Sequence, residues 1–126
     1  MSSSAGTQPR RRWRFYATAS GRKPVKDALD DLSALDAASV AAAMIEARSL
    51  GREHPDVNHL RGDIWQMEID GQRVIYRLLF AEEGRSGRIL LALELVKKKW
   101  QKARERHIKT AEDRLADWRG QPRPNS

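Results

Sequence analysis

Apolar and polar residues alternate over residues 12–19, and this alternation predicts a β-strand. Trp13, Phe15 and Ala17 fall on one face of the extended chain, with Arg14, a tyrosine and a threonine between them on the other. A Ser-Gly turn follows. The folded part of the chain is therefore expected to begin with a strand that buries one face.

Two segments with helical spacing come next. Pro24 suits the first turn of a helix, and Asp36 is a candidate N-cap for a second helix that Gly51 would end. Because only a few residues separate the two helices, we expect them to form a helical hairpin. The apolar positions that would face inward are Val25, Ala28, Leu29 and Leu32 in the first helix and Ala37, Val40, Ala41, Met44, Ala47 and Leu50 in the second.

After a polar segment over residues 52–62, which we interpret as a loop, the apolar period changes from helical to two. Three short runs with this period predict three consecutive strands, of which the last is the most apolar and is expected to be central. Asp70 and Gly71 form a strong hairpin-turn signal between the first two runs. The predicted strands cover residues 64–69, 73–80 and 88–96.

The hairpin turn also predicts how the first two strands pair. A two-residue turn places Glu68 opposite Arg73 and leaves Arg77 further along its strand, free to contact a ligand. One face of these strands then carries Gln66 together with these three charged residues. That face is too polar to be fully buried, so we expect it to present a site.

A final amphipathic helix is predicted over residues 104–118, with Ile108, Ala111, Leu115 and Trp118 facing inward. Consecutive strands joined by tight turns favour an antiparallel sheet, here of about four strands, with helices packed on it. The predicted class is therefore α+β, with an N-terminal strand, a helical hairpin and a C-terminal helix.

The length of 126 residues fits one folded domain, which we place at residues 10–119. Residues 1–9 and 120–126 are polar and rich in Gly or Pro, so we expect disordered tails. The chain has no cysteine, which excludes disulfides and zinc–thiolate sites. With no apolar secretory segment and no run near the roughly 20 apolar residues of a membrane span, we expect a cytoplasmic protein.

The net charge of +7 is unevenly distributed along the chain. Residues 1–14 carry +4, residues 97–109 carry +6 and residues 119–126 carry +2, so the rest of the chain carries −5. A basic cluster on an acidic body favours a polyanionic partner, with nucleic acid first. A solvated helix face with a flexible tail would give the same charge pattern, and composition alone does not separate the two.

Several chemistries have no support in the sequence. The three histidines lack metal-ligand spacing, and no nucleophile elbow or phosphate-binding glycine loop is present. The basic run at residues 97–102 is more informative, because its cations could hold an RNA backbone and Trp100 could stack on an unpaired base. Alternatively, Trp100 covers the core and the lysines are solvated.

From Leu60 to Trp118 the chain resembles the phage-derived branch of the RelE/HigB-like toxins of bacterial type II toxin–antitoxin modules. The predicted strand and helical hairpin upstream of Leu60 also match in order, and no single motif is unique to the family. The matching motifs are Leu60-Arg-Gly62, Trp65-Gln-Met-Glu68, Tyr76-Arg77, Lys98-Lys-Trp-Gln-Lys102 and Arg114-Leu-Ala-Asp-Trp118.

The resemblance implies a RelE-like fold and a ribosome-associated endoribonuclease that cuts mRNA and stops translation without a metal or other cofactor. It also implies an antitoxin partner, usually a helix-turn-helix protein. In this reaction a 2′-hydroxyl attacks the adjacent phosphate, which requires proton transfer and cations. Arg77 matches the family's strand arginine and is the first candidate for charge stabilisation, and Lys98 or Lys102 could transfer a proton. The residues assigned to RNA binding are Arg73, Lys97, Lys99, Trp100 and Gln101.

Three departures from the family pattern leave other functions open. Gln66 stands where the family has glutamate, and Glu68 stands where it has arginine, so Glu68 either acts as a general base or pairs with Arg73. The basic run also has Lys-Trp and Ala-Arg in place of Lys-Thr and Thr-Pro. The alternatives are a toxin that binds DNA gyrase, as the ParE toxins do, and an impaired toxin that only binds its antitoxin.

Overall fold

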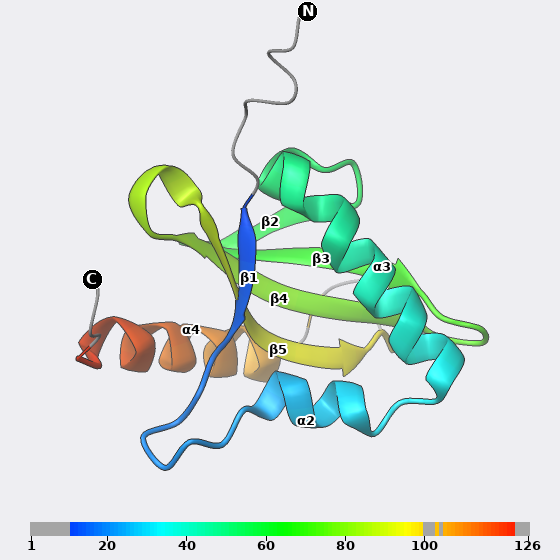
Figure 1. Cartoon of the computed structure of the whole chain (residues 1–126), viewed down its shortest axis with the longest axis horizontal. Coiled ribbons are helices and arrows are strands. Elements are labelled where there is room, and N and C mark those ends of the chain that lie inside the picture. The colour runs from blue at the N-terminus through cyan, green and yellow to red at the C-terminus, as the bar shows by residue number, and fades with distance from the viewer. Residues whose placement is uncertain (1–10, 100–102, 104, 123–126) are drawn as a thin grey trace, which may run out of the picture.

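The computed structural model describes residues 11–99, 103 and 105–122, and all structural statements refer to these residues. Within them the chain forms a five-stranded sheet and three helices (Figure 1). In chain order the elements are β1 (Arg12–Phe15), α2 (Pro24–Asp30), α3 (Ala34–Leu50), β2 (Val57–Arg61), β3 (Ile64–Asp70), β4 (Ile75–Glu83), β5 (Ile89–Lys97) and α4 (Glu105–Gly120).

The strands lie in the order β1-β5-β4-β3-β2, with β1 parallel to β5 and the other neighbours antiparallel. Helices α2 and α3 cover one face of the sheet and α4 covers the other (Figure 1). The predicted α+β class is confirmed, and the arrangement is consistent with a RelE-like fold. The sheet has one strand more than expected, and its centre is β4 rather than β5.

Each face of the sheet has its own hydrophobic core. Leu78 and Phe80 of β4 pack towards α2 and α3, whereas Leu79 and Ala81 pack towards α4. Because both faces of β4 are covered, its sequence is a nearly continuous apolar run rather than an alternation. The inward stripe predicted for the last helix is confirmed: Ala111, Leu115 and Trp118 are buried and Ile108 packs beside them.

The expected loop over residues 52–62 contains β2, so that expectation is wrong. β2 pairs antiparallel with β3 along the edge of the sheet. Val57 is buried, while Asn58 and His59 are exposed. Backbone pairing with β3 forms this strand, and the polar side chains typical of an edge strand gave it the composition of a loop.

The hairpin between β3 and β4 is longer than predicted. Asp70 pairs with Ile75, so the connecting loop has the four residues 71–74 and is closed by a bond from the Gly71 N–H to the Val74 carbonyl, 2.8 Å. The pairing therefore differs from the predicted one by four residues. Because four is even, every side chain keeps the face that alternation assigned to it.

Asp36 anchors this hairpin loop from α3 and is not the cap of that helix. Ser33 is the N-cap, and its Oγ accepts from the Asp36 N–H at 3.2 Å. The Asp36 carboxylate accepts from the Tyr76 hydroxyl at 2.6 Å and from the Gln72 N–H at 2.8 Å. The bond from Tyr76, and then the one from Gln72, lowers the pKa of Asp36. A Cβ at Gly71 would lie 2.7 Å from the Tyr76 ring, so this close approach requires glycine.

The lowered pKa of Asp36 predicts a pH-dependent contribution to stability. The contribution is present above the pKa of an unfolded aspartate, about 4, and is lost as the pH falls through the folded value. Asp36→Asn should therefore reduce the free energy of unfolding at about pH 7 and by less at about pH 3. Urea unfolding of both proteins measures this, with exposed Asp31→Asn as the charge-matched control. An equal difference at both pH values contradicts the prediction.

Candidate functional site

A cluster of charged side chains occupies the α4 face of the sheet at the end where β5 leaves it. Glu68 of β3 lies directly opposite Arg77 of β4, and their Oε2 and Nε atoms are 3.8 Å apart. The Lys98 ammonium, which follows β5, lies 3.4 Å from the same carboxylate. The expectation that Arg73 pairs with Glu68 and leaves Arg77 free is wrong, because the longer loop places Arg77 opposite Glu68.

The expectation that this sheet face is not fully buried is confirmed, since Arg73 is exposed and Glu68 is partly exposed, whereas its two other polar residues are buried. Arg77 is 2% exposed and Gln66 is 5% exposed. A buried guanidinium needs a counter-charge and hydrogen bonds to offset its lost hydration. Glu68 supplies the counter-charge to Arg77, and Lys98 at the surface balances Glu68 in turn. The cluster therefore carries a net positive charge, and Arg77 is its most buried cation.

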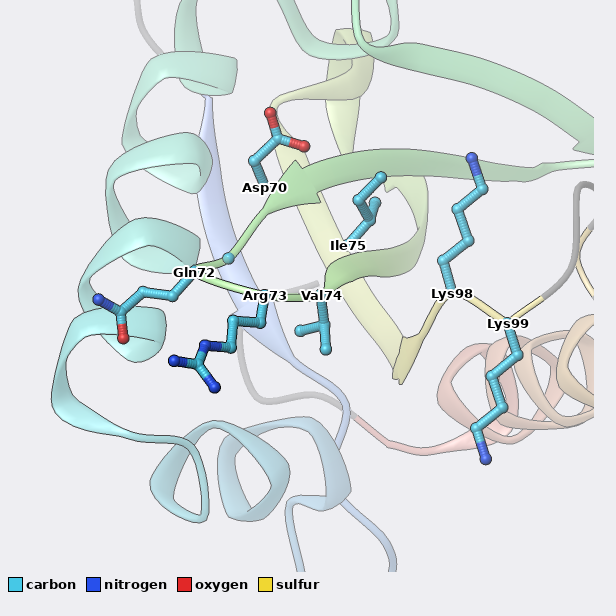
Figure 2. Close-up of a pocket in the computed structure, with 8 residues that line it drawn as sticks. Asp70, Gln72, Arg73, Val74, Ile75, Lys98 and Lys99 are labelled. Atoms are coloured by element: carbon cyan, nitrogen blue, oxygen red, sulfur yellow. The ribbon is translucent and has the colours of Figure 1, made fainter.

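An open basin of about 770 Å³ lies beside this cluster, between the β3–β4 loop and the segment that follows β5. Its lining includes Arg73 from the loop together with Lys98 and Lys99. Figure 2 shows Lys98 and Lys99 extending in opposite directions from the chain beyond β5, and Arg73 extending from the hairpin loop. Three of the cations predicted from the sequence thus meet around one surface.

A second and smaller cavity of about 270 Å³ opens between the end of β5 and the start of α4. Buried Arg77 forms part of its lining, and Lys99 lines both this cavity and the basin. Its volume is about nine times the ~30 Å³ of a water molecule, which leaves room for a phosphate group. The charged and titratable residues of its described lining are Arg77, Lys97, Lys99, Arg106 and His107.

Sequence reasoning assigned neither Arg106 nor His107 of this cavity to the site, and the more informative of the two is His107. Its Nδ1 lies 3.2 Å from Oε2 of Glu94 in β5, and Oε1 of that carboxylate accepts from Arg114 of α4 at 3.0 Å. A signal was present in the sequence, because His107 lies four residues before Ala111, on the inward face of the predicted helix. Including this position, next to Ile108, in the inward stripe would have placed a histidine against the sheet.

The remaining predicted site residues divide into two groups. Lys97 and Lys99 lie on the small cavity, as described above, and both are exposed. Trp100, Gln101 and Lys102 lie outside the described residues, so their assigned roles stay predictions. A surface with several cations around two cavities that share Lys99 is suited to an extended polyanion, in which successive phosphates contact separate cations.

The profile of the phage-derived Gp49-like protein family matches residues 27–116. The chain belongs to this family. The Gp49-like family is a RelE-like toxin family, and membership is therefore compatible with a toxin of a toxin–antitoxin system, which implies an antitoxin as partner. No curated protein matches the sequence significantly. Among the described helices, none combines the length and the apolar character that crossing a membrane requires.

Proposed function

We propose that this Gp49-like protein is the toxin of a type II toxin–antitoxin system and acts as a ribosome-dependent endoribonuclease on mRNA. The observation that carries the proposal is buried Arg77, which lines a cavity whose other charged groups are cations and a histidine. Such a site fits the anionic centre of a phosphodiester. The proposed partners are mRNA, the ribosome in the cytoplasm and a helix-turn-helix antitoxin.

The charge change in the reaction explains why Arg77 is suited to this role. When a 2′-oxygen attacks the neighbouring phosphorus, the phosphoryl oxygens gain negative charge in the transition state. A cation that is already desolvated and held in place stabilises that charge more than a solvated one does. Burial beneath the cavity and the contact with Glu68 give Arg77 both properties.

Glu68 replaces an arginine of the family pattern, yet two neighbouring cations offset the repulsion between its negative charge and the RNA. Its carboxylate lies within 4 Å of both Arg77 and Lys98, so the three groups together carry one positive charge. We therefore propose that Glu68 holds Arg77 in place. This arrangement supports an active nuclease over an impaired toxin, because the reversed charge is compensated locally.

The basin provides a path for the RNA backbone towards Arg77. Arg73, Lys98 and Lys99 surround it and would neutralise phosphates on either side of the cleaved bond. Trp100, Gln101 and Lys102 continue this basic segment in the sequence, and we propose that they extend the same contact. The binding is then largely electrostatic and weakens as salt increases.

The test is induced expression in a bacterial host, with mapping of mRNA 5′ ends, followed by cleavage on purified ribosomes. We expect growth arrest, new ends within translated frames, and products with a 2′,3′-cyclic phosphate and a 5′-hydroxyl. A message with a 2′-deoxynucleotide at the cleaved position should resist cleavage. Arrest without new ends supports a protein target such as gyrase, and no arrest by folded protein supports the impaired toxin.

A further inference from the structure

A β-bulge in β5 turns two consecutive side chains towards the same face of the sheet. Leu79 of β4 pairs with Glu94 whereas Phe80 pairs with Ala92, so Leu93 is an extra residue in β5. Leu93 packs in the core beneath α4, and Glu94 contacts two residues of α4. In a regular strand, neighbouring side chains point to opposite faces. The bulge is therefore what brings the Glu94 carboxylate to α4.

The Glu94 carboxylate is held on one side and orients His107 on the other. Arg114 donates to Glu94 Oε1 at 3.0 Å and to the Leu93 carbonyl at 2.7 Å, which clamps the bulge. The other carboxylate oxygen lies 3.2 Å from His107 Nδ1. A carboxylate only accepts hydrogen bonds, so Nδ1 carries the proton and Nε2 remains the basic nitrogen of the neutral ring.

His107 and Arg77 line the same cavity. The histidine side chain is 21% exposed, so the ring is held by its neighbours and still reached from solvent. The other charged groups around the cavity are Lys97 and Lys99 from the end of β5 and Arg106 from α4. The cavity thus combines a buried cation for a phosphate with an oriented imidazole, which are the two functions that cleavage of RNA requires.

We propose that His107 is the general base of the cleavage reaction and that Glu94 is its positioning residue. The inference rests on the proposed nuclease function. Nε2 takes the proton of the 2′-hydroxyl as the 2′-oxygen forms its bond to phosphorus, and the bond from phosphorus to the 5′-oxygen breaks. The leaving 5′-oxygen takes a proton from water, and the imidazolium returns its proton to the hydroxide formed.

This assignment replaces Lys98 as the group that transfers the proton. The Lys98 ammonium donates to Glu68, so its charge is used in the ion-pair cluster. Glu68 in turn lies between two cations, which favours its role in holding Arg77. Among the described residues of the cavity, His107 carries a side chain with one nitrogen that can accept a proton and one that donates a hydrogen bond.

The experiment measures single-turnover cleavage of mRNA on programmed ribosomes by His107→Ala and His107→Asn. We expect the rate to fall roughly 100-fold or more in both variants, with ribosome binding unchanged. Asn keeps a donor for Glu94 and cannot exchange the proton, so it separates catalysis from packing. Added imidazole should restore part of the rate of His107→Ala and none of the rate of an Arg77→Gln protein. Exposed His59→Ala is the matched control and should cleave like the wild type.

The outcomes separate this inference from the proposed function. Wild-type protein that cleaves no mRNA contradicts the nuclease proposal and the role of His107 with it. If the wild-type protein cleaves mRNA and a folded His107→Asn variant cleaves at the same rate, only the role of His107 as general base is overturned. Loss of cleavage in His107→Ala that imidazole does not restore assigns the residue to packing and also overturns the inference.

A double-mutant cycle tests the positioning role of Glu94. Glu94→Gln keeps the size of the side chain and removes its charge, and we expect cleavage to slow by roughly 10-fold or more, because the imidazole loses the carboxylate that fixes its tautomer. In the His107→Asn background the same change should slow cleavage no further. Equal losses in both backgrounds assign Glu94 to the docking of α4 and overturn its proposed role.

Discussion

Arg77→Gln is expected to slow mRNA cleavage by about 100-fold or more while the domain stays folded. Removing one preorganised donor from a developing anionic charge typically costs about 100- to 1000-fold in rate. The fold is expected to persist because Glu68 keeps Lys98 at 3.4 Å as a counter-ion when the guanidinium is removed. The new amide also fills most of the space of the side chain, which is almost fully buried.

Single-turnover cleavage on ribosomes and growth arrest in the host measure this effect. Arg85→Gln removes the same charge from an exposed turn at the other end of β4, and it should leave both readouts unchanged. Arg77→Lys keeps the charge without the planar fork and should give an intermediate rate. Cleavage at the wild-type rate by a folded Arg77→Gln protein would remove this arginine from the mechanism.

Phe80→Ala is expected to destabilise the domain by about 3–5 kcal/mol, which is the usual cost of truncating a buried phenylalanine. Phe80 is fully buried in β4, and its ring meets the Trp13 ring edge to face, with the centroids 5.4 Å apart. The substitution therefore opens a cavity in the core and removes the contact that joins β1 to the central strand. Against a typical total stability of about 5–15 kcal/mol, this loss is large.

Urea unfolding, followed by circular dichroism, measures the change. Leu35→Ala removes a similar apolar side chain from the exposed surface of α3 and should alter stability by less than about 0.5 kcal/mol. A loss below about 1 kcal/mol for Phe80→Ala would show that the core collapses around the truncated side chain. Such a result would also mean that the contact with Trp13 contributes little to the docking of β1.

The loss of stability in Phe80→Ala and the loss of activity in Arg77→Gln arise from opposite faces of one sheet. The face under α2 and α3 is apolar along β4, and it provides much of the stability. The face under α4 carries the second apolar core and is charged at the end beside the start of α4. Because Phe80 and Arg77 belong to the same strand and point to opposite faces, stability and activity can be altered separately in neighbouring positions.

Much of the site could be predicted from local sequence. Alternation placed Glu68 and Arg77 on a common face, and the basic run placed Lys97, Lys98 and Lys99 at the end of the last strand. The structure brings these residues to one end of the sheet. The assignment of these side chains to a strand face is confirmed because it depends on the period of two in a strand, which a register shift of four residues leaves unchanged.

The pairing within the site could not be predicted, because it depends on groups distant in the sequence. Asp36 binds the β3–β4 loop through Gln72 and Tyr76, and this contact from α3 supports a four-residue loop where the local signal indicated two. The same loop places Arg77 opposite Glu68. The Asp-Gly signal reflects only the local backbone preference for a turn. It therefore cannot predict the effect of a carboxylate that lies 36 residues away in the sequence.

The sequence by itself determined the α+β class, the order of most elements and the faces of the main strands, since these follow from the spacing of apolar residues. The tertiary structure alone decided that residues 57–61 form an edge strand, because backbone pairing does not require an apolar pattern. It also decided that Glu94 meets His107, because an extra residue in β5 breaks the alternation on which sequence reasoning depends. The spacing of apolar residues predicts which face of a strand or helix is buried, whereas only the packed structure shows which side chains of different elements contact each other.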